Sequence, residues 1–351
     1  MQPRPLPPEL ASGPFTRARA RELGVPDARL TRTDMHHPLH GVWTARPASA
    51  AAGPVAPPHQ SRLTPIDPDL RRRLDTAGTA LPAGAAFSHA TAALIHGLPV
   101  PAHLEHRLDL DICAPTSSGQ PRREGWAGHR GAERRQVVTV HGLPVTDIAD
   151  TWVDLGALAT RRWRLLDLDD LVVAGDEVLN RLMGRHTRRS NAPGQAWHHN
   201  PRLVAAAGAD LEHVLGGRVR PRGKALLIQA RTLMRPGVRS PQETRARLLF
   251  VRAGLPEPQV NANLYAVGGG WLGEGDLVWP GRRVVAEYQG DHHAQRSRRS
   301  ADAQRLAVLR DEGWTVHEIW AEDLLPGARR SHLLIRVADA LGLDPGTVHL
   351  W

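Results

Sequence analysis

The sequence predicts an α/β chain of several domains: an N-terminal winged helix-turn-helix, a middle domain of mixed α+β structure, and a C-terminal domain with the element order αβββαβ. Three observations support this prediction. The 351 residues exceed what one hydrophobic core usually holds, so two or three domains are expected. Two short helix patterns separated by a glycine stand near the N-terminus. Helix and strand patterns then follow one another across the last third of the chain.

The charge of the chain favours a polyanionic partner. Lys and Arg total 45 against 36 Asp and Glu, which gives a net charge of +9 and a pI near 11. Nucleic acid is the commonest polyanion bound by basic soluble proteins, so DNA is the expected partner. Lys224 is the only lysine, however, and a chain rich in Arg, Ala, Gly and Pro is also typical of genomic base-composition bias.

Cysteine usage and hydropathy predict the compartment. Cys113 is the only cysteine, which excludes a disulfide framework and a zinc site built on cysteines. No apolar run reaches the roughly 18–20 residues of a membrane helix, and the first residues lack the apolar core of a signal peptide. We therefore expect a protein of the reducing cytoplasm with no membrane partner. The sequence leaves its oligomeric state open.

The N-terminal residues divide into a tail and a small domain. Residues 1–12 are rich in proline, so a disordered tail is expected. Over residues 13–45 the pattern predicts the winged helix-turn-helix. Thr16 caps a helix over 17–23, Gly24 ends it, Pro26 opens a second helix that runs to about residue 33, and residues 39–43 form the wing strand.

Four arginines of this domain are the expected DNA contacts. Arg29 and Arg32 lie on the second predicted helix, which enters the major groove in such domains, and Arg17 and Arg19 lie on the first, where they meet phosphates. The alternative is a solvated, arginine-rich helix pair that packs on its neighbour and binds no DNA.

Residues 46–65 form an expected linker, because they are rich in Ala, Pro and Ser. The second domain spans residues 66–215. Its expected elements are a helix over 87–97, strands over 108–112 and 137–140, a helix through Trp152 that residues 142–146 cap, and a helix over 168–179. Ser88, His89, Asp150 and Asp154 are residue types of a hydrolase triad, but no Gly-x-Ser-x-Gly elbow accompanies them, and Ser88 is more simply a helix N-cap.

Several segments of this region resemble the AbiEi family of type IV toxin-antitoxin antitoxins over roughly residues 13–180. They are the helix-turn-helix from Phe15, Ser88-His-Ala-Thr-Ala-Ala, Gly142-Leu-Pro-Val-Thr, Val153-Asp-Leu and Leu171-Val-Val-Ala-Gly-Asp. The resemblance implies a winged helix-turn-helix joined to an antitoxin domain, regulation of the protein's own operon, and a cognate toxin as partner.

The C-terminal domain is expected over residues 236–345. Ser240, Pro241 and Glu243 predict a helix start in which Ser240 is the N-cap and Glu243 completes a capping box. Alternating apolar residues then predict a strand over 260–266, a second strand carrying Asp276, and a nearly continuous apolar third strand over 284–288. A helix over about 298–312, a strand over 314–320 and a last helix complete the order.

Two carboxylates are the best sequence evidence of function. If the turn at residues 280–283 pairs Trp279 with Val284 in a hairpin, counting outward places Asp276 opposite Glu287. Like charges directly opposite one another destabilise a strand pair, by roughly 0.2–1 kcal/mol. A cation between the two carboxylates would explain the arrangement. The alternative is a pair of solvated hairpin residues.

The element order is that of the PD-(D/E)XK nuclease fold, which restriction endonucleases share. The chain also resembles an uncharacterised bacterial domain family related to very-short-patch repair endonucleases, through the ordered motifs Ser240-Pro-x-Glu-Thr, Gly254-Leu-Pro-x-Pro-x-Val, Asp276-x-x-Trp-Pro and Glu287-Tyr-Gln-Gly-Asp-His-His. The resemblance implies phosphodiester hydrolysis with Mg²⁺ (or Mn²⁺) held by Asp276 and Glu287.

One position departs from this pattern. Gln289 stands where the fold typically carries a lysine, and glutamine can orient a water but brings no charge. Either His292, His293 or Arg305 supplies the positive charge that Gln289 lacks, or hydrolysis is weak. His293 is a candidate general acid or base, or else a histidine of a polar loop. Glu243 is a candidate third acid, although its capping role already explains it.

Three hypotheses follow. The first is a metal-dependent DNA endonuclease that the N-terminal domain targets to DNA, with Asp276, Glu287, Gln289, Glu243 and His293 as candidate catalytic residues. The second is a non-enzymatic DNA-binding antitoxin or transcriptional regulator with a degenerate nuclease domain. The third is an antitoxin that acts by binding its toxin directly.

Overall fold

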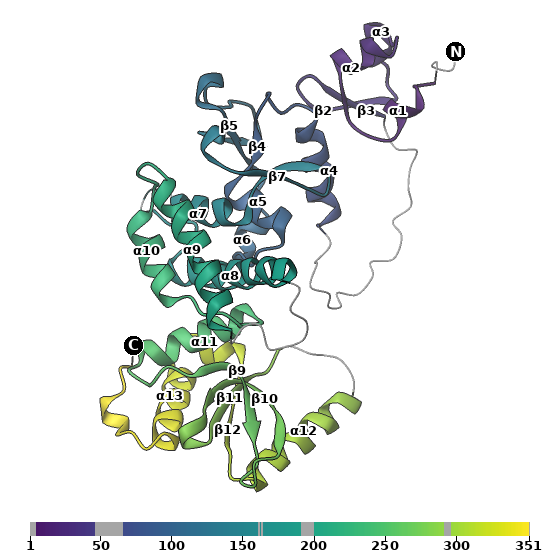
Figure 1. The fold of residues 1–351 in the computed structure, drawn as a ribbon. Coiled ribbons are helices and arrows are strands. Elements are labelled where there is room, and N and C mark those ends of the chain that lie inside the picture. The colour runs from purple at the N-terminus through teal and green to yellow at the C-terminus, as the bar shows by residue number, and fades with distance from the viewer. Residues whose placement is uncertain are drawn as a thin grey trace. The chain divides into compact units, whose positions relative to one another are not determined.

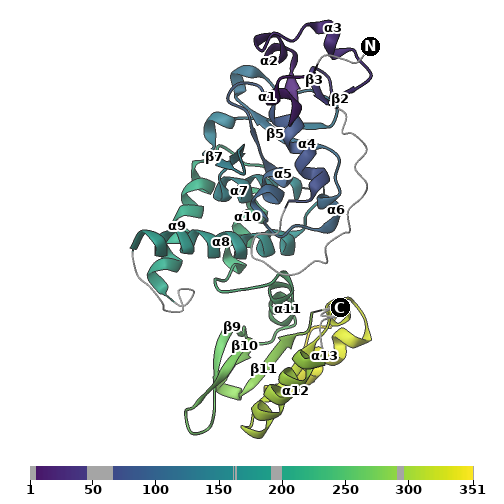
Figure 2. The ribbon, with the colours of Figure 1, turned by 90° about the vertical axis from the view of Figure 1, so that its right-hand side faces the viewer.

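A computed structural model of the chain describes residues 5–45, 66–160, 162, 164–190, 200–290 and 296–350, with the backbone alone at 188–190 and 296–303. The chain divides into two compact units, Met1–Leu155 and Gly156–Trp351. Both mix helices and strands (Figures 1 and 2), so the expected α/β class with several domains is confirmed at that level. No helix of the described residues is long and apolar enough to cross a membrane.

The first unit holds two sheets and a set of mostly short helices. Its N-terminal elements are α1 (Pro8–Ala11), β1 (Phe15–Thr16), α2 (Arg17–Glu22), α3 (Asp27–Leu30), β2 (Met35–Leu39) and β3 (Val42–Ala45), with strand order β1-β3-β2. The elements that follow are α4 (Pro68–Gly78), β4 (Ala86–Phe87), α5 (His89–His96), α6 (Ala102–Glu105), β5 (Leu110–Ala114), β6 (Trp126–Arg130), β7 (Val137–Val140), β8 (Leu143–Thr146) and α7 (Ile148–Leu158), with strand order β6-β5-β4-β8-β7.

The expected disordered tail over residues 1–12 is wrong for its second half. Residues 8–11 form α1, which begins at a proline, and Leu10 is only 1% exposed. Leu10 packs with Phe15, Leu30 and Trp43 in the core of the small N-terminal sheet. Burial of these apolar side chains outweighs the proline-rich composition. Residues 1–4 and the expected linker over 46–65 lie outside the described residues.

The wing also differs from its prediction. The segment expected as one strand contains the turn between β2 and β3, where Gly41 adopts a φ of 80° that favours glycine. The second helix, α3, has four residues and ends at Leu30, because the chain must turn before the strand that begins at Met35. The element pattern is thus two short helices followed by a two-stranded hairpin.

Residues 142–146 form a strand and do not cap a helix. β8 pairs with β7 so that Val140 lies opposite Leu143, which leaves a two-residue loop of His141 and Gly142. Both loop residues have positive φ, 52° and 79°, as a type I′ hairpin turn requires. This hairpin joins the edge strand β7 to the sheet, and α7 begins only at Ile148.

The second unit combines a helical layer with a four-stranded sheet. Its elements are α8 (Leu168–Ser190), α9 (Pro201–Gly217), α10 (Lys224–Leu233), α11 (Pro241–Arg252), β9 (Gln259–Tyr265), β10 (Trp271–Trp279), β11 (Val284–Tyr288), α12 (Arg296–Asp311), β12 (Thr315–Ile319) and α13 (Ala328–Ala340). From α11 onward this is the predicted order of helix, three strands, helix, strand and helix.

The sheet of this unit has the strand order β12-β11-β10-β9, with β12 parallel to β11 and the other pairs antiparallel. Helices α11 and α13 pack on one face through a core that includes Phe250, Trp279 and Leu334. Helix α12 packs on the other face through Leu309, Val278 and Val285. The two layers are visible on either side of the sheet in Figure 1.

The second compact unit, Gly156–Trp351, contains both the helix α8 and the C-terminal sheet. Helix α8 belongs with the C-terminal sheet because a buried polar network joins it to α11. Asp176 on α8 accepts hydrogen bonds from the Thr244 hydroxyl at 2.8 Å and the Arg235 N–H at 2.7 Å, and it lies 3.5 Å from the Arg247 guanidinium. Arg247 is 1% exposed and also donates to the Leu233 carbonyl and to Glu257.

This network predicts a large difference between two arginines of α11. Replacing Arg247 with alanine leaves the buried Asp176 carboxylate without its cation, so we expect a loss of about 3–5 kcal/mol in the free energy of unfolding. Arg252 forms a more exposed pair with Asp169, and Arg252→Ala should lose at most about 1 kcal/mol. Urea denaturation at pH 8 measures both, and equal losses would refute the assignment.

Candidate active site

The hairpin of β10 and β11 has the predicted register. Trp279 lies opposite Val284 and Leu277 opposite Ala286, and continuing this register places Asp276 opposite Glu287. Residues 280–282 form a tight helical turn, and Arg283 closes it with a φ of 52°. Because opposite residues share a face of the sheet, the two carboxylates lie side by side on the face that α12 covers.

Asp276 is fixed by the strand opposite. The Tyr288 N–H donates to Oδ2 of Asp276 at 2.9 Å. Burial raises the pKa of this carboxyl above its usual value, although the hydrogen bond and the charges of Arg305 and Arg239 oppose that rise. Oδ1 has no hydrogen-bond partner among the described residues, so one oxygen remains able to bind a ligand.

Glu243 comes to the same place from the first turn of α11. Ser240 caps this helix as predicted, because its Oγ accepts the Glu243 N–H at 3.2 Å. The Glu243 carboxylate, however, does not return to the N-cap backbone as in a capping box. Its Oε2 accepts the Arg239 N–H at 3.0 Å and the Asn261 side-chain amide at 2.7 Å. The side chain is thereby held pointing toward the sheet.

The electrostatics of Glu243 connect it with Asp276. The residue is 6% exposed, and burial raises the pKa of its carboxyl, with the charge of Asp276 as the second cause. Hydrogen bonds from the Arg239 backbone, Asn261 and Ser240 oppose this rise. A buried and a half-buried carboxylate that repel each other are suited to share a cation.

Glu287 is engaged differently. Its two oxygens accept hydrogen bonds from the guanidinium of Arg305 on α12, each at 2.9 Å, and Arg305 also donates to the Glu274 carbonyl. This fork-to-fork geometry is the strong form of an arginine–carboxylate pair. Arg305 thus reaches from α12 to the carboxylate of Glu287.

Gln289 follows β11 at the same edge of the sheet. Its N–H donates to the Ile319 carbonyl at 2.8 Å, which extends the pairing of β11 with β12, and the residue is half-buried. The candidate residues His292 and His293 lie outside the described residues. Among the described residues, Arg305 and Arg239 bring positive charge to Asp276, and Arg305 is one of the residues considered as a substitute for the missing lysine.

The cation expected at these carboxylates is Mg²⁺ or Mn²⁺. Within the described ranges, no group of three or more His, Cys, Asp or Glu side chains is arranged to hold a metal ion. Magnesium is usually bound by only one or two carboxylates together with substrate phosphate and water. Among the described residues, Oδ1 of Asp276 is a carboxylate oxygen without a hydrogen bond, and Glu243 and Glu287 are the neighbouring carboxylates.

The sequence did not identify Asn261, which positions the Glu243 side chain. Asn261 was expected within a regular strand, yet it has a φ of 45° and turns its side chain into the interior, where it holds Glu243. An asparagine tolerates this conformation better than most residues, but nothing in the alternating pattern around it indicates the irregularity. The role of Asn261 therefore becomes visible only once Glu243 and β9 are in place.

The four N-terminal arginines differ in exposure and in their ion-pair partners. Arg17 is exposed and lies over the Trp43 ring at 5.1 Å, and Arg19 is exposed and pairs with Glu22. Arg32 is exposed. Arg29 is 10% exposed at its side chain and forms two hydrogen bonds with Asp34 at 2.9 and 2.6 Å. Arg29 thus has a structural partner, whereas Arg32, expected on the second helix, lies in the turn after α3 and is exposed.

The histidine segment of the first unit is a buried polar cluster. His89 stacks on His129 with ring centroids 3.6 Å apart, and its Nδ1 lies 3.0 Å from the Ser88 Oγ and 3.9 Å from Asp154. Asp154 itself is held by Arg135. Serine and aspartate therefore approach the same ring nitrogen, whereas a triad needs them on opposite nitrogens. Ser88 precedes α5 but caps none of its N–H groups.

Comparison with known proteins yields few relatives. The chain is similar to two uncharacterised proteins of Mycobacterium tuberculosis, MT2308 of strain CDC 1551 and Rv2248 of strain H37Rv, each 29% identical over 127 residues. That match covers 35% of this chain and 45% of each relative, so the chain spans less than half of their length. No family model and no solved structure matches the chain.

The raised pKa of Asp276 predicts a pH-dependent stability difference. A carboxyl whose folded pKa lies above its unfolded value stabilises the fold only at low pH, and this contribution is lost as the pH rises through the folded value. Asp276→Asn removes the buried charge, and its Oδ1 can still accept the Tyr288 N–H. The variant should match the wild type near pH 4 and be more stable at pH 8.

Denaturation at several pH values measures this difference. Asp311→Asn, which removes an exposed carboxylate at the end of α12, is the matched control and should stay within about 0.5 kcal/mol of the wild type. A loss of stability in Asp276→Asn at pH 8 would show that the ionised carboxylate is not under electrostatic strain.

Proposed function

We propose that this protein is a cytoplasmic, metal-dependent DNA endonuclease whose site is formed by Glu243, Asp276 and Glu287. The observation that carries the proposal is a pair of neighbouring relations: the β10–β11 register sets Asp276 opposite Glu287, and the charge of Asp276 acts on Glu243 of α11. Glu243 is buried and Asp276 is half-buried, their charges repel each other, and Oδ1 of Asp276 has no hydrogen-bond partner among the described residues. Such an arrangement is costly unless a cation offsets it.

The chemistry follows from the positions of the protein groups. When bound, Mg²⁺ or Mn²⁺ supplies a Lewis acid that polarises a phosphodiester oxygen and lowers the pKa of a water. Asp276 and Glu243 would hold the ion, with Glu287 as the third acid. Arg305 brings a fixed positive charge to the negative charge that develops on phosphorus oxygens. Gln289 can orient the attacking water through its side-chain amide.

The N-terminal small sheet and its helices are the proposed DNA-targeting element. Arg17, Arg19 and Arg32 are exposed there, and exposed arginines provide the phosphate contacts that position a protein on a duplex. The resemblance of this region to a winged helix-turn-helix supports the same role. Arg29 is assigned to the stability of the fold through Asp34.

A second candidate function is a non-enzymatic DNA-binding regulator or antitoxin, with a cognate toxin as partner. It is favoured by one observation: both oxygens of Glu287 are already engaged by Arg305. The glutamine at position 289, where the nuclease pattern has a lysine, also favours the regulator. In that case the acidic site would serve as a structural ion pair, and DNA binding would not need a metal.

Cleavage assays distinguish the two functions. Asp276→Asn and Glu287→Gln should each reduce Mg²⁺-dependent nicking of supercoiled DNA by about 10³-fold or more, because each removes an oxygen that the metal needs. Asp311→Asn, with one exposed carboxylate removed, should cleave like the wild type. If the wild type cuts no DNA with Mg²⁺ or Mn²⁺ yet shifts duplex DNA in EDTA, the regulator is correct.

The charge at the site gives a second functional prediction. Gln289→Lys should raise the cleavage rate, because it supplies the positive charge that the nuclease pattern places there. Arg305→Gln should lower the rate by about 10²-fold, the usual loss on removing one preorganised donor. Single-turnover rates at saturating Mg²⁺ measure both effects. An Arg305→Gln enzyme with an unchanged rate would restrict Arg305 to a structural role.

A further inference from the structure

The outer edge of β12 is open in the described part of the chain. β12 ends the strand order, and its neighbour on the inner side is β11. Thr315 N–H donates to the Arg283 carbonyl and Gln289 N–H to the Ile319 carbonyl, so the residues at 315, 317 and 319 direct their backbone groups inward. The backbone N–H and C=O groups of Val316 and Glu318 therefore face away from the sheet.

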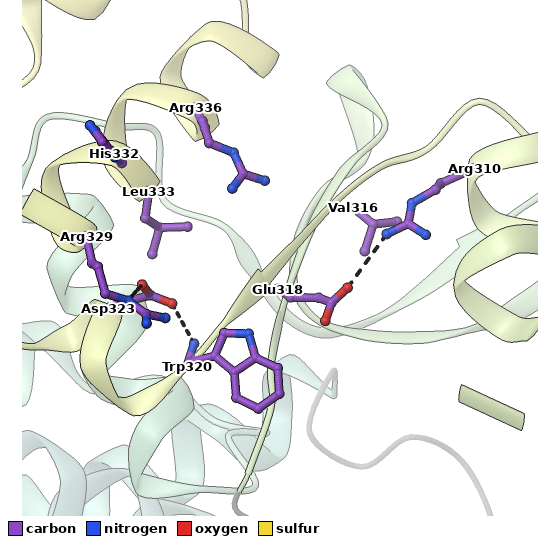
Figure 3. Close-up of a pocket in the computed structure, with 9 residues that line it drawn as sticks. All are labelled: Arg310, Val316, Glu318, Trp320, Asp323, Arg329, His332, Leu333 and Arg336. Atoms are coloured by element: carbon purple, nitrogen blue, oxygen red, sulfur yellow. Dashed lines mark hydrogen bonds and ion pairs between the residues drawn. The ribbon is translucent and has the colours of Figure 1, made fainter. Parts of the chain in front are cut away.

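A hollow of about 420 Å³ lies along this edge, between α12 and α13 (Figure 3). The side chains from α13 follow one helix face at i, i+3, i+4 and i+7 spacing. They are Arg329, His332, Leu333 and Arg336. Arg310 of α12 closes the opposite side, and Val316, Glu318, Trp320 and Asp323 complete the lining.

The charges of the hollow are not balanced by its own acids. Asp323 accepts the Trp320 N–H at 2.8 Å and the Arg329 side chain at 3.0 Å, and Glu318 lies 3.7 Å from Arg310. Arg336 has no carboxylate partner among the described residues. Its nearest polar group there is Nδ1 of His317 at 3.5 Å, and burial, with the charge of Arg336 second, lowers the pKa of that histidine to about 4.

An aromatic side chain accompanies this unpaired cation. Trp320 is 42% exposed, which is high for a tryptophan, and its indole stands beside the hollow opposite Arg336 (Figure 3). An exposed aromatic ring beside an arginine is the combination on which single-stranded nucleic acids are bound, with a base stacked on the ring and a phosphate on the cation.

The hollow is also next to the proposed active site. Glu318 pairs with Glu287 in the register of β12 and β11, so one strand spacing of about 4.8 Å separates the two backbones. A nucleic acid strand that crosses this edge of the sheet would reach the hollow within one or two nucleotides of the carboxylates.

We infer that this hollow is a nucleotide subsite for a single-stranded segment of the nucleic acid, with one base on Trp320 and a backbone phosphate on Arg336. The inference rests on the proposed function for the role of the bound strand, but binding itself requires neither metal nor cleavage. The expected substrate then has an unpaired segment close to the scissile phosphate.

Fluorescence anisotropy of the full chain with a labelled short oligothymidylate in EDTA tests the subsite. Arg336→Gln should weaken binding roughly tenfold and reduce the slope of log affinity against log salt by about 0.7, the value for one single-strand phosphate contact. Trp320→Ala should weaken binding by about tenfold as well. Arg336→Lys keeps the charge and should bind within about threefold of the wild type.

Lys224→Gln is the matched control, because it removes one exposed positive charge from the same unit outside the hollow, and it should bind like the wild type. A 5-bromouracil-substituted oligonucleotide should crosslink to Trp320. Wild-type binding by both Arg336→Gln and Trp320→Ala overturns the subsite, as does an acidic peptide that binds the hollow while the oligonucleotide does not. A wild-type protein that cuts no DNA but shows these binding losses refutes the nuclease and leaves the subsite intact.

Discussion

The register of the β10–β11 hairpin is the constraint on which the rest of the site depends. The turn after Trp279 pairs that residue with Val284, and the two-residue period of a strand then places Asp276 and Glu287 on one face. A slip of one residue would move Asp276 to the opposite face, into the core beneath α11 and α13, where a carboxylate could not remain charged. The apolar residues on both faces of β10 and β11 hold this register against such a slip.

Two opposing electrostatic effects meet on this face. Burial raises the pKa of Glu243 and of Asp276, which disfavours their charged forms. The charges of Arg305 and Arg239 oppose the rise in the pKa of Asp276. Arg305 also donates two hydrogen bonds to Glu287. The site is thus only partly neutralised by the protein itself. An endonuclease would use the remaining negative potential to bind a cation, whereas a regulator would need the arginines alone to keep the fold intact.

The sign of the unbalanced charge changes at the edge strand β12. Glu318 follows Glu287 across the sheet, but at the outer edge Arg336 of α13 has no carboxylate partner among the described residues. An acidic centre beside a basic, aromatic edge would suit the polyanion of the proposed function, because a cation at the carboxylates and phosphate contacts at the edge would then act on neighbouring groups.

The sequence by itself determined the order of elements in the C-terminal sheet, the helix start at Ser240, and the pairing of Asp276 with Glu287. Each of these follows from local rules, namely capping, strand alternation and the length of a turn. The same rules predicted a helix cap at residues 142–146, because a two-residue turn with positive φ resembles a helix start. They also missed α1, because its stability comes from burying Leu10 in a core that later residues assemble.

Only the tertiary structure decided which charges meet. Arg305 contacts a residue 18 positions away, and Asp176 contacts Arg247 across 71 positions, distances along the chain at which no periodicity carries information. The same holds for the basic hollow beside Trp320, since α12 and α13 meet there only because both pack on the sheet that ends at β12. Ion pairing and burial depend on packing in three dimensions, and so the chemistry of this site was open until the fold was known.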